Sequence, residues 1–201
     1  MPSPFGSWER GSTYAPASTA LALGTPVYTV DMSSAGVKRS AMVVRGRVVK
    51  NSSGVALLPK YLCAWKTTAI GTEVDGYQRT LAGPAAGFVD EHVVSTGVPN
   101  GDNFLLITNG PCLGTTSQAG SVENLITAGD ELHGLTAAAS THSTTAGRVY
   151  AFFADSAVFT ATQTTDGTAN RVALNRIGRA ISAKTTGQSA ADVLLYALLP
   201  Y

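Results

Sequence analysis

The string Gly-Pro-Cys-Leu-Gly at residues 110–114 is the part of the sequence closest to a catalytic motif. It has the G-x-nucleophile-x-G form of a nucleophile elbow, which needs a strand before the nucleophile and a helix after it. A strand is predicted before the string, but residues 115–120 are small and polar and predict a loop. The proline before Cys112 also fixes a backbone unlike the strained elbow. We therefore expect a tight turn with a buried thiol rather than a nucleophile.

The histidines His92, His133 and His142 are the other candidates for acid–base chemistry or metal binding. Asp90 and Glu91 directly precede His92, and a similar acidic pair lies before His133. Adjacent residues of a strand point to opposite faces, so neither group is expected to converge on one ion. Spacing alone does not test a serine–histidine–aspartate arrangement, which forms in space. We expect no enzymatic activity, no metal and no cofactor.

The two cysteines, Cys63 and Cys112, lie far apart in the chain. A metal site would need more ligands at short spacing, and the sequence contains no Cys-x-x-Cys pair. We expect both to be reduced, buried thiols in a protein made in a cytoplasm.

Length and composition exclude several classes of protein. The 201 residues suffice for one domain, or two small ones, with a substantial core. Charged residues make up 13%, hydrophobic residues 44%, and the net charge is +1. Disordered chains and dedicated nucleic-acid binders have higher charge. No apolar run approaches the ~20 residues of a membrane span, and the start lacks signal-peptide features. We expect a soluble protein without nucleic-acid or membrane partners.

Short runs rich in β-branched and aromatic residues predict an all-β fold. They cover residues 26–30, 42–49, 55–58, 61–65, 104–108, 148–153, 177–183 and 193–199, with a turn at 109–111. Turn residues separate these runs at short intervals, as in a sandwich or a barrel. No run predicts an amphipathic helix longer than three turns.

Residues 1–24 differ from the rest because three prolines interrupt any regular element. The same stretch contains Phe5, Trp8 and Tyr14. We expect an extended arm that docks these rings on a neighbouring subunit or partner, with a floppy terminus as the alternative. Burial of three rings does not offset the entropy of ordering some twenty residues, so the arm should not order on its own domain. Residues 25–201 then form the β-rich domain, either as one unit or as two β-subdomains with a break near residue 95.

Charge is distributed unevenly along the chain. The segment 38–66 has seven basic residues and no acidic one, whereas 73–131 has eight acidic residues and one basic residue. The basic set comprises Lys38, Arg39, Arg45, Arg47, Lys50, Lys60 and Lys66. Strand pairing either mixes these blocks into a neutral surface or leaves a basic and an acidic face suited to layered assembly. In the second case the basic segment should contact an acidic surface on a partner or a sister subunit.

Several short strings follow one another in the second half of the chain. They are VPNGDNF at 98–104 leading into ITNGP at 107–111, ITAGDEL at 126–132, AGRV at 146–149, NRIGRAISA at 175–183 and VLLY at 193–196. In order and spacing they resemble the head decoration, or cement, proteins of tailed bacteriophages. The resemblance covers about residues 95–201, and more loosely 51–91. In the ITAGDEL string, Gly is expected to supply a positive φ and Asp to cap the turn.

The resemblance implies a small β-barrel or β-tulip-like domain that binds the outside of the expanded capsid and stabilises the mature shell. The implied partners are the major capsid protein and sister subunits, often as trimers, with N-terminal arms that reach the shell. Such a protein is made in the host bacterial cytoplasm and ends on the exterior of the virion. Two alternatives remain: a tail, collar or fibre component, or a carbohydrate-binding β-sandwich. The sandwich would use Trp8, Tyr61, Trp65 or Tyr77 as its stacking platform.

Overall fold

The computed structural model describes residues 8–15, 21–33, 37–77, 85–116, 126–134, 149–151, 176–184 and 191–199. These residues form strands and contain no helix, which confirms the all-β prediction. The strands are β1 (Thr13–Tyr14), β2 (Pro26–Met32), β3 (Lys38–Asn51), β4 (Leu62–Trp65), β5 (Glu73–Tyr77), β6 (Ala85–Val89), β7 (Asn103–Thr115), β8 (Glu131–Gly134), β9 (Val149–Ala151), β10 (Arg176–Ala180) and β11 (Asp192–Leu198). Within the described ranges, no helix is long and apolar enough to cross a membrane.

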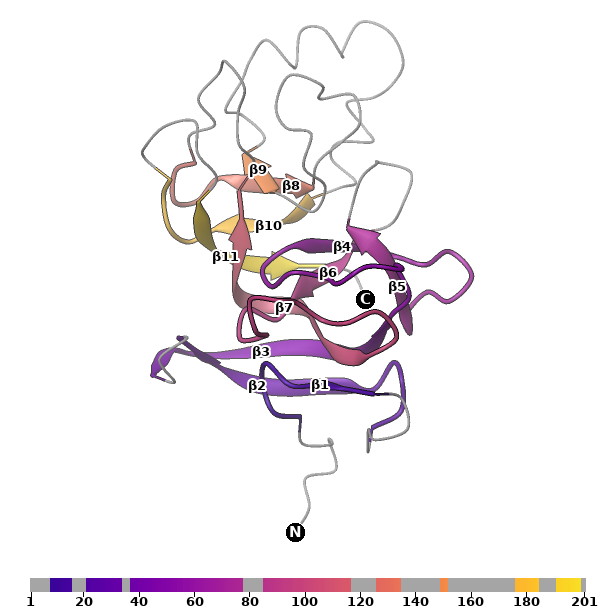
Figure 1. Ribbon diagram of the computed structural model, residues 1–201. Coiled ribbons are helices and arrows are strands. Elements are labelled where there is room, and N and C mark those ends of the chain that lie inside the picture. The colour runs from indigo at the N-terminus through magenta and orange to yellow at the C-terminus, as the bar shows by residue number, and fades with distance from the viewer. Residues whose placement is uncertain are drawn as a thin grey trace, which may run out of the picture.

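Five strands close into a small barrel in the order β3-β5-β4-β6-β7 and back to β3 (Figure 1). The β3–β5 contact is parallel, and the other four contacts are antiparallel. The ring closes because β3 pairs with β5 along residues 50–51 and with β7 along residues 45–50. The predicted choice between barrel and sandwich is therefore resolved in favour of a barrel for this half of the fold.

A second sheet continues from the barrel through the long strand β7 (Figure 1). Its order is β7-β11-β10-β8-β9, and every contact is antiparallel. The pairing of β7 with β11 runs from Asn109 to Thr115, beyond the part of β7 that closes the barrel. One strand therefore belongs to both structures.

Alternation along β7 produces two hydrophobic cores. Phe104 and Leu106 point into the barrel, where they join Trp65 and other apolar side chains. Leu105 and Ile107 point the other way, into a larger cluster that includes residues of β10 and β11. Successive side chains of a strand lie on opposite faces, so β7 is buried on both. The barrel core contains residues from both sides of residue 95, among them Trp65 and Phe104.

The predicted turn at 109–111 is wrong, because these residues lie inside β7. Gly110 has a φ of 102°, and a Cβ at this position would lie 2.6 Å from the carbonyl oxygen of Val43. The register between β3 and β7 shifts next to this point, where β7 leaves β3 and continues along β11. The Asn-Gly-Pro sequence therefore bends a continuous strand instead of reversing the chain. The predicted strand at 55–58 is reduced to a single bridge between Leu57 and Val98.

The N-terminal segment packs on its own domain, contrary to prediction. Trp8 is 8% exposed and belongs to the larger core, and its ring meets that of Tyr14 edge-on at 4.9 Å. Strand β1, Thr13–Tyr14, pairs with the start of β7. Residues 8–15 contain no proline, so all of their backbone N–H groups can donate hydrogen bonds. Phe5 lies outside the described residues.

Candidate functional site

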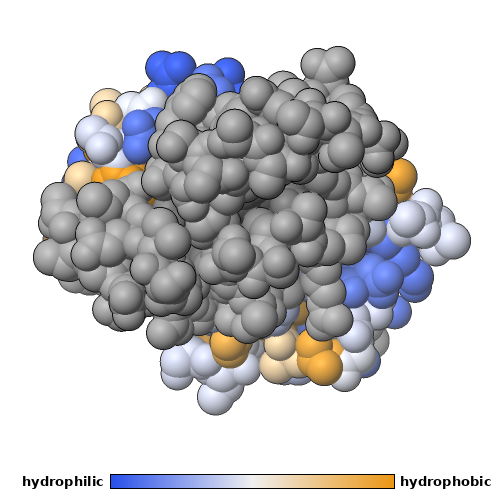
Figure 2. All heavy atoms as spheres, turned by 90° about the horizontal axis from the view of Figure 1, so that it is seen from above, coloured by the Kyte–Doolittle hydropathy of each residue, from blue (hydrophilic) through white to orange (hydrophobic). Residues whose placement is uncertain are grey.

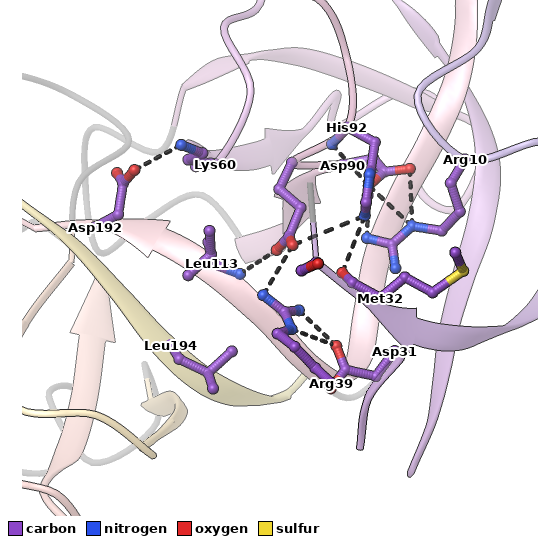
Figure 3. Close-up of polar contacts among 12 residues, drawn as sticks. Arg10, Asp31, Met32, Arg39, Lys60, Asp90, His92, Leu113, Asp192 and Leu194 are labelled. Atoms are coloured by element: carbon purple, nitrogen blue, oxygen red, sulfur yellow. Dashed lines mark hydrogen bonds and ion pairs between the residues drawn. The ribbon is translucent and has the colours of Figure 1, made fainter. Parts of the chain in front are cut away.

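A buried ion pair holds the N-terminal segment against the turn that follows β6 (Figure 3). The guanidinium of Arg10 grips the carboxylate of Asp90, with Nη2 2.6 Å from Oδ1 and Nε 3.1 Å from Oδ2. The backbone N–H of Gly11 donates to the same carboxylate at 2.9 Å. The side chain of Asp90 is completely buried, so its charge depends on these donors.

Arg39 forms the second half of this network by bridging two buried carboxylates (Figure 3). Its Nε lies 2.9 Å from Asp31 Oδ1 on β2, and its Nη1 lies 2.9 Å from Glu91 Oε1. The other oxygen of Glu91 accepts the backbone N–H of Leu113 on β7 at 2.6 Å. The pair β2–β3, which we call the β2–β3 ribbon, is thereby tied to the barrel.

The acidic turn at 90–92 links the N-terminal segment and the β2–β3 ribbon to the barrel. Asp90 and Glu91 are each occupied by an arginine, and Nε2 of His92 lies 3.2 Å from the carbonyl oxygen of Met32. Among the described residues there is no group of three or more His, Cys, Asp or Glu side chains that could hold a metal. His142 lies outside these residues, and nothing is described of the His133 side chain.

Both cysteines are buried and free. Burial raises the pKa of the Cys63 thiol, and burial together with the nearby charge of Glu91 raises the pKa of the Cys112 thiol. A thiol with a raised pKa carries almost no thiolate at neutral pH. The buried thiol predicted at Cys112 is present, although in a strand and not in a turn.

Three of the basic residues predicted to bind a partner are paired within the chain. Arg39 is held by Asp31 and Glu91, Lys60 Nζ lies 2.6 Å from Asp192, and Lys66 Nζ lies 2.7 Å from Glu73. A fourth, Arg47, donates to the carbonyl oxygen of Gly24 at 3.3 Å. Strand pairing thus places these basic residues next to acidic side chains or carbonyl oxygens from other parts of the chain.

Two basic residues of the predicted set stay exposed, and both lie on the β2–β3 ribbon. Lys38 begins β3, and Arg45 sits over the ring of Tyr28 with its guanidinium carbon 5.9 Å from the ring centre. Tyr28 is 47% exposed, and its neighbours along the same face, Val30 and Val43, are 45% and 54% exposed. This combination of an aromatic ring, an arginine and aliphatic side chains is typical of protein–protein contacts.

The aromatic residues do not form a common stacking platform. Trp8 and Trp65 are buried in different cores, and only Tyr61 and Tyr77 lie together, with ring centres 5.0 Å apart. The hydroxyl of Tyr77 accepts the backbone N–H of Leu58 at 2.6 Å. The described surface seen from above also shows hydrophilic and hydrophobic groups interspersed around its rim (Figure 2). The ring pair Tyr61–Tyr77 is the part of the predicted stacking platform that the structure brings together.

Three of the strings behind the decoration-protein resemblance, at 126–132, 175–183 and 193–196, contribute strands to the second sheet. Gly129 has a φ of 100°, and the carboxylate of Asp130 accepts the backbone N–H of Thr127 at 2.8 Å, which confirms the predicted roles of the two residues in the turn. Backbone hydrogen bonds of 2.8 Å then join this turn to Ala180 in both directions. No protein-family model matches the chain, and no curated protein matches it to a significant degree.

Proposed function

We propose that this protein is a structural component of a tailed-bacteriophage head, which binds the outside of the capsid and stabilises the mature shell. Its partners would be the major capsid protein and sister subunits. The proposal concerns binding alone and assigns no reaction to the chain.

The observation that carries the proposal is the spatial meeting of the resembling strings. The turn at 126–130 leads into β8, β10 lies within the string at 175–183, and the string at 193–196 lies in β11. These strands are neighbours in the order β8-β10-β11. Gly178 allows β10 and β11 to approach each other closely, since a Cβ at this position would lie 2.3 Å from the carbonyl oxygen of Tyr196. Because these three strings lie side by side in one sheet, they support an architecture shared with the decoration proteins better than three scattered strings would.

The construction of the fold also suits a particle surface. Ion pairs and two hydrophobic cores hold the described strands together, so this part of the chain should lose little conformational entropy when it binds. Contacts too weak to hold one copy become effective when they are repeated across a lattice or linked in an oligomer. A protein that binds only the mature shell stabilises that shell by mass action.

The test is sedimentation of the purified protein with heads grown without it, from the phage that encodes the chain. We expect saturable binding to expanded heads and little to unexpanded precursors, and decorated heads should release DNA at a higher temperature. Protein that stays in the supernatant of both kinds of head at micromolar concentration would refute the proposal.

A further inference from the structure

The outer half of the β2–β3 ribbon presents apolar side chains that the molecule itself does not cover. Tyr28 is registered against Arg45, and Val30 against Val43, so their side chains share one face of the antiparallel pair. Each of the three apolar residues is between 45% and 54% exposed. Large β-branched and aromatic residues favour burial, and an exposed group of them marks an interaction site.

The outer part of the ribbon, which we call the ribbon tip (residues 28–33 and 37–45), projects sideways beyond β7 (Figure 1). Strand β7 pairs with β3 only from Arg45 onward, and in the described structure the preceding residues of β3 pair only with β2. The side chain of Met42 lies on the opposite face of β3 from that of Val43 and is 43% exposed. Val37, which precedes β3, is 64% exposed. Apolar side chains on both sides suit insertion into a groove better than contact with a flat surface.

The exposed charged side chains of the ribbon are all positive. Its single acidic residue, Asp31, is 1% exposed and is held by Arg39 and by the hydroxyl of Ser40, which donates at 2.8 Å. The exposed charges are those of Lys38 and Arg45. A matching surface must therefore be apolar in the centre and acidic at its rim.

The root of the ribbon is held in place before any partner binds. Val27 and Val44 are buried in the larger core, and Gly46 packs so closely that a Cβ would lie 2.6 Å from the carbonyl oxygen of Leu106. Arg39 adds the link to Glu91. A fixed projecting element loses little entropy on docking.

We propose that the ribbon tip is the docking element, and that it inserts into an apolar groove with acidic side chains at its rim. Given the proposed function, on which this inference rests, the groove belongs to the shell protein of the capsid. A second copy of the same ribbon fits less well, because a symmetric contact would bring Lys38 and Arg45 of both copies together. Nucleic acid fits less well too, since valines and a methionine outnumber the two cations.

The test compares particle binding of ribbon variants with variants at equally exposed positions elsewhere. The ribbon variant is Val30→Ser with Val43→Ser, and its control is Ile70→Ser with Val94→Ser, whose native side chains are 49% and 64% exposed. Arg45→Glu is matched by Arg179→Glu on β10, where the native side chain is 56% exposed. We expect each ribbon variant to bind heads roughly tenfold more weakly and each control to stay within about twofold. Circular dichroism checks that all variants are folded.

A labelling measurement does not depend on the stability of the double variant. Since the native thiols are buried, a thiol introduced by Val43→Cys should react with maleimide in the free protein and be protected on heads. The thiol introduced by Val94→Cys should react in both states.

The outcomes separate the two proposals. If the wild-type protein does not bind heads, the proposed function fails, and this inference fails with it. If it binds and the ribbon variants bind equally well, only the docking element is wrong. Ribbon-dependent binding to phosphatidylglycerol vesicles instead of heads, or a self-association that the ribbon variants abolish, would equally overturn the choice of partner.

Discussion

Arg10 and Asp90 stand eighty positions apart in the chain, yet Nη2 of the arginine lies 2.6 Å from Oδ1 of the aspartate, with side chains only 9% and 0% exposed. The contact fixes the N-terminal segment to the turn after β6. A Cβ at the neighbouring Gly11 would lie 2.4 Å from the carbonyl oxygen of His92, so the two backbones touch. Residues 8–15 are thus an integral part of the folded domain.

Replacing Arg10 by alanine should strongly destabilise the protein. The substitution leaves the Asp90 carboxylate buried without its counter-ion, and breaking such a pair costs about 3–5 kcal/mol. Arg179→Ala is the matched control: this arginine is 56% exposed and 3.8 Å from Glu131, and its loss should cost at most about 0.5 kcal/mol. Urea unfolding monitored by circular dichroism measures both. Equal unfolding midpoints for the two variants would contradict the importance of the ion pair.

Asn51 should tolerate substitution poorly because its side chain organises a loop from within. Its Nδ2 donates to the carbonyl oxygens of Val55 at 2.8 Å and Val98 at 2.9 Å, and its Oδ1 accepts from Ser53. Asn51→Ala removes these contacts and should cost about 2–3 kcal/mol in urea unfolding, since a completely buried side chain loses several hydrogen bonds at once. A cost below about 0.5 kcal/mol, as expected for an exposed residue such as Asn100, would show that water replaces the side chain.

Gly178→Ala tests whether the contact of β10 with β11 requires glycine. The added Cβ would lie 2.3 Å from the Tyr196 carbonyl oxygen, so the strands must separate, at a cost of about 3 kcal/mol. Gly129→Ala separates conformational strain from crowding, because Gly129 has a positive φ and no atom within 4 Å of the position of a Cβ. That variant should lose only about 1 kcal/mol. Thermal unfolding that ranks Gly129→Ala as the more harmful change would refute this close approach.

The ion pair of Glu73 with Lys66 should make stability depend on pH in the acid range. The hydrogen bond from Lys66 and then that from Ser52 hold the pKa of Glu73 below its ordinary value of 4.5. A depressed pKa in the folded state contributes stability above pH 4.5, and this contribution is lost as the pH falls through the folded-state value. Glu73→Gln should lose less stability than the wild type over that interval, as measured by urea midpoints. Parallel curves for the two proteins would show that the pair is fully screened by solvent.

The sequence predicted those strands that show clear alternation or a run of β-branched residues. Alternation in 193–199 corresponds to β11, where Val193, Leu195 and Ala197 are buried and the residues between them are more exposed. The β-branched run at 42–49 lies within β3. In contrast, β6 was missed because its sequence, AAGFV, consists mostly of small residues, which have low strand propensity.

The packing of residues 8–15 and the pairing of the basic residues were not visible in the sequence for one physical reason. Composition described residues 1–24 as a tail, but Asp90, which pairs with Arg10, is remote in sequence. The basic segment likewise finds its acids across the fold, as Lys60 does at Asp192. Long-range pairing of this kind leaves no local signal. The exposed ribbon tip was missed for the complementary reason, because Val30 and Val43 have the same sequence signature as buried strand residues.

The two faces of β7 become buried at different times during synthesis. All five barrel strands have left the ribosome once Thr115 is free, but Leu105 and Ile107 on their outer side still lack the cover of β10 and β11. That apolar face stays open to water until β11 has been synthesised. The nascent protein is therefore exposed to aggregation between the emergence of β7 and that of β11, and deletion of β11 would leave it in this state permanently.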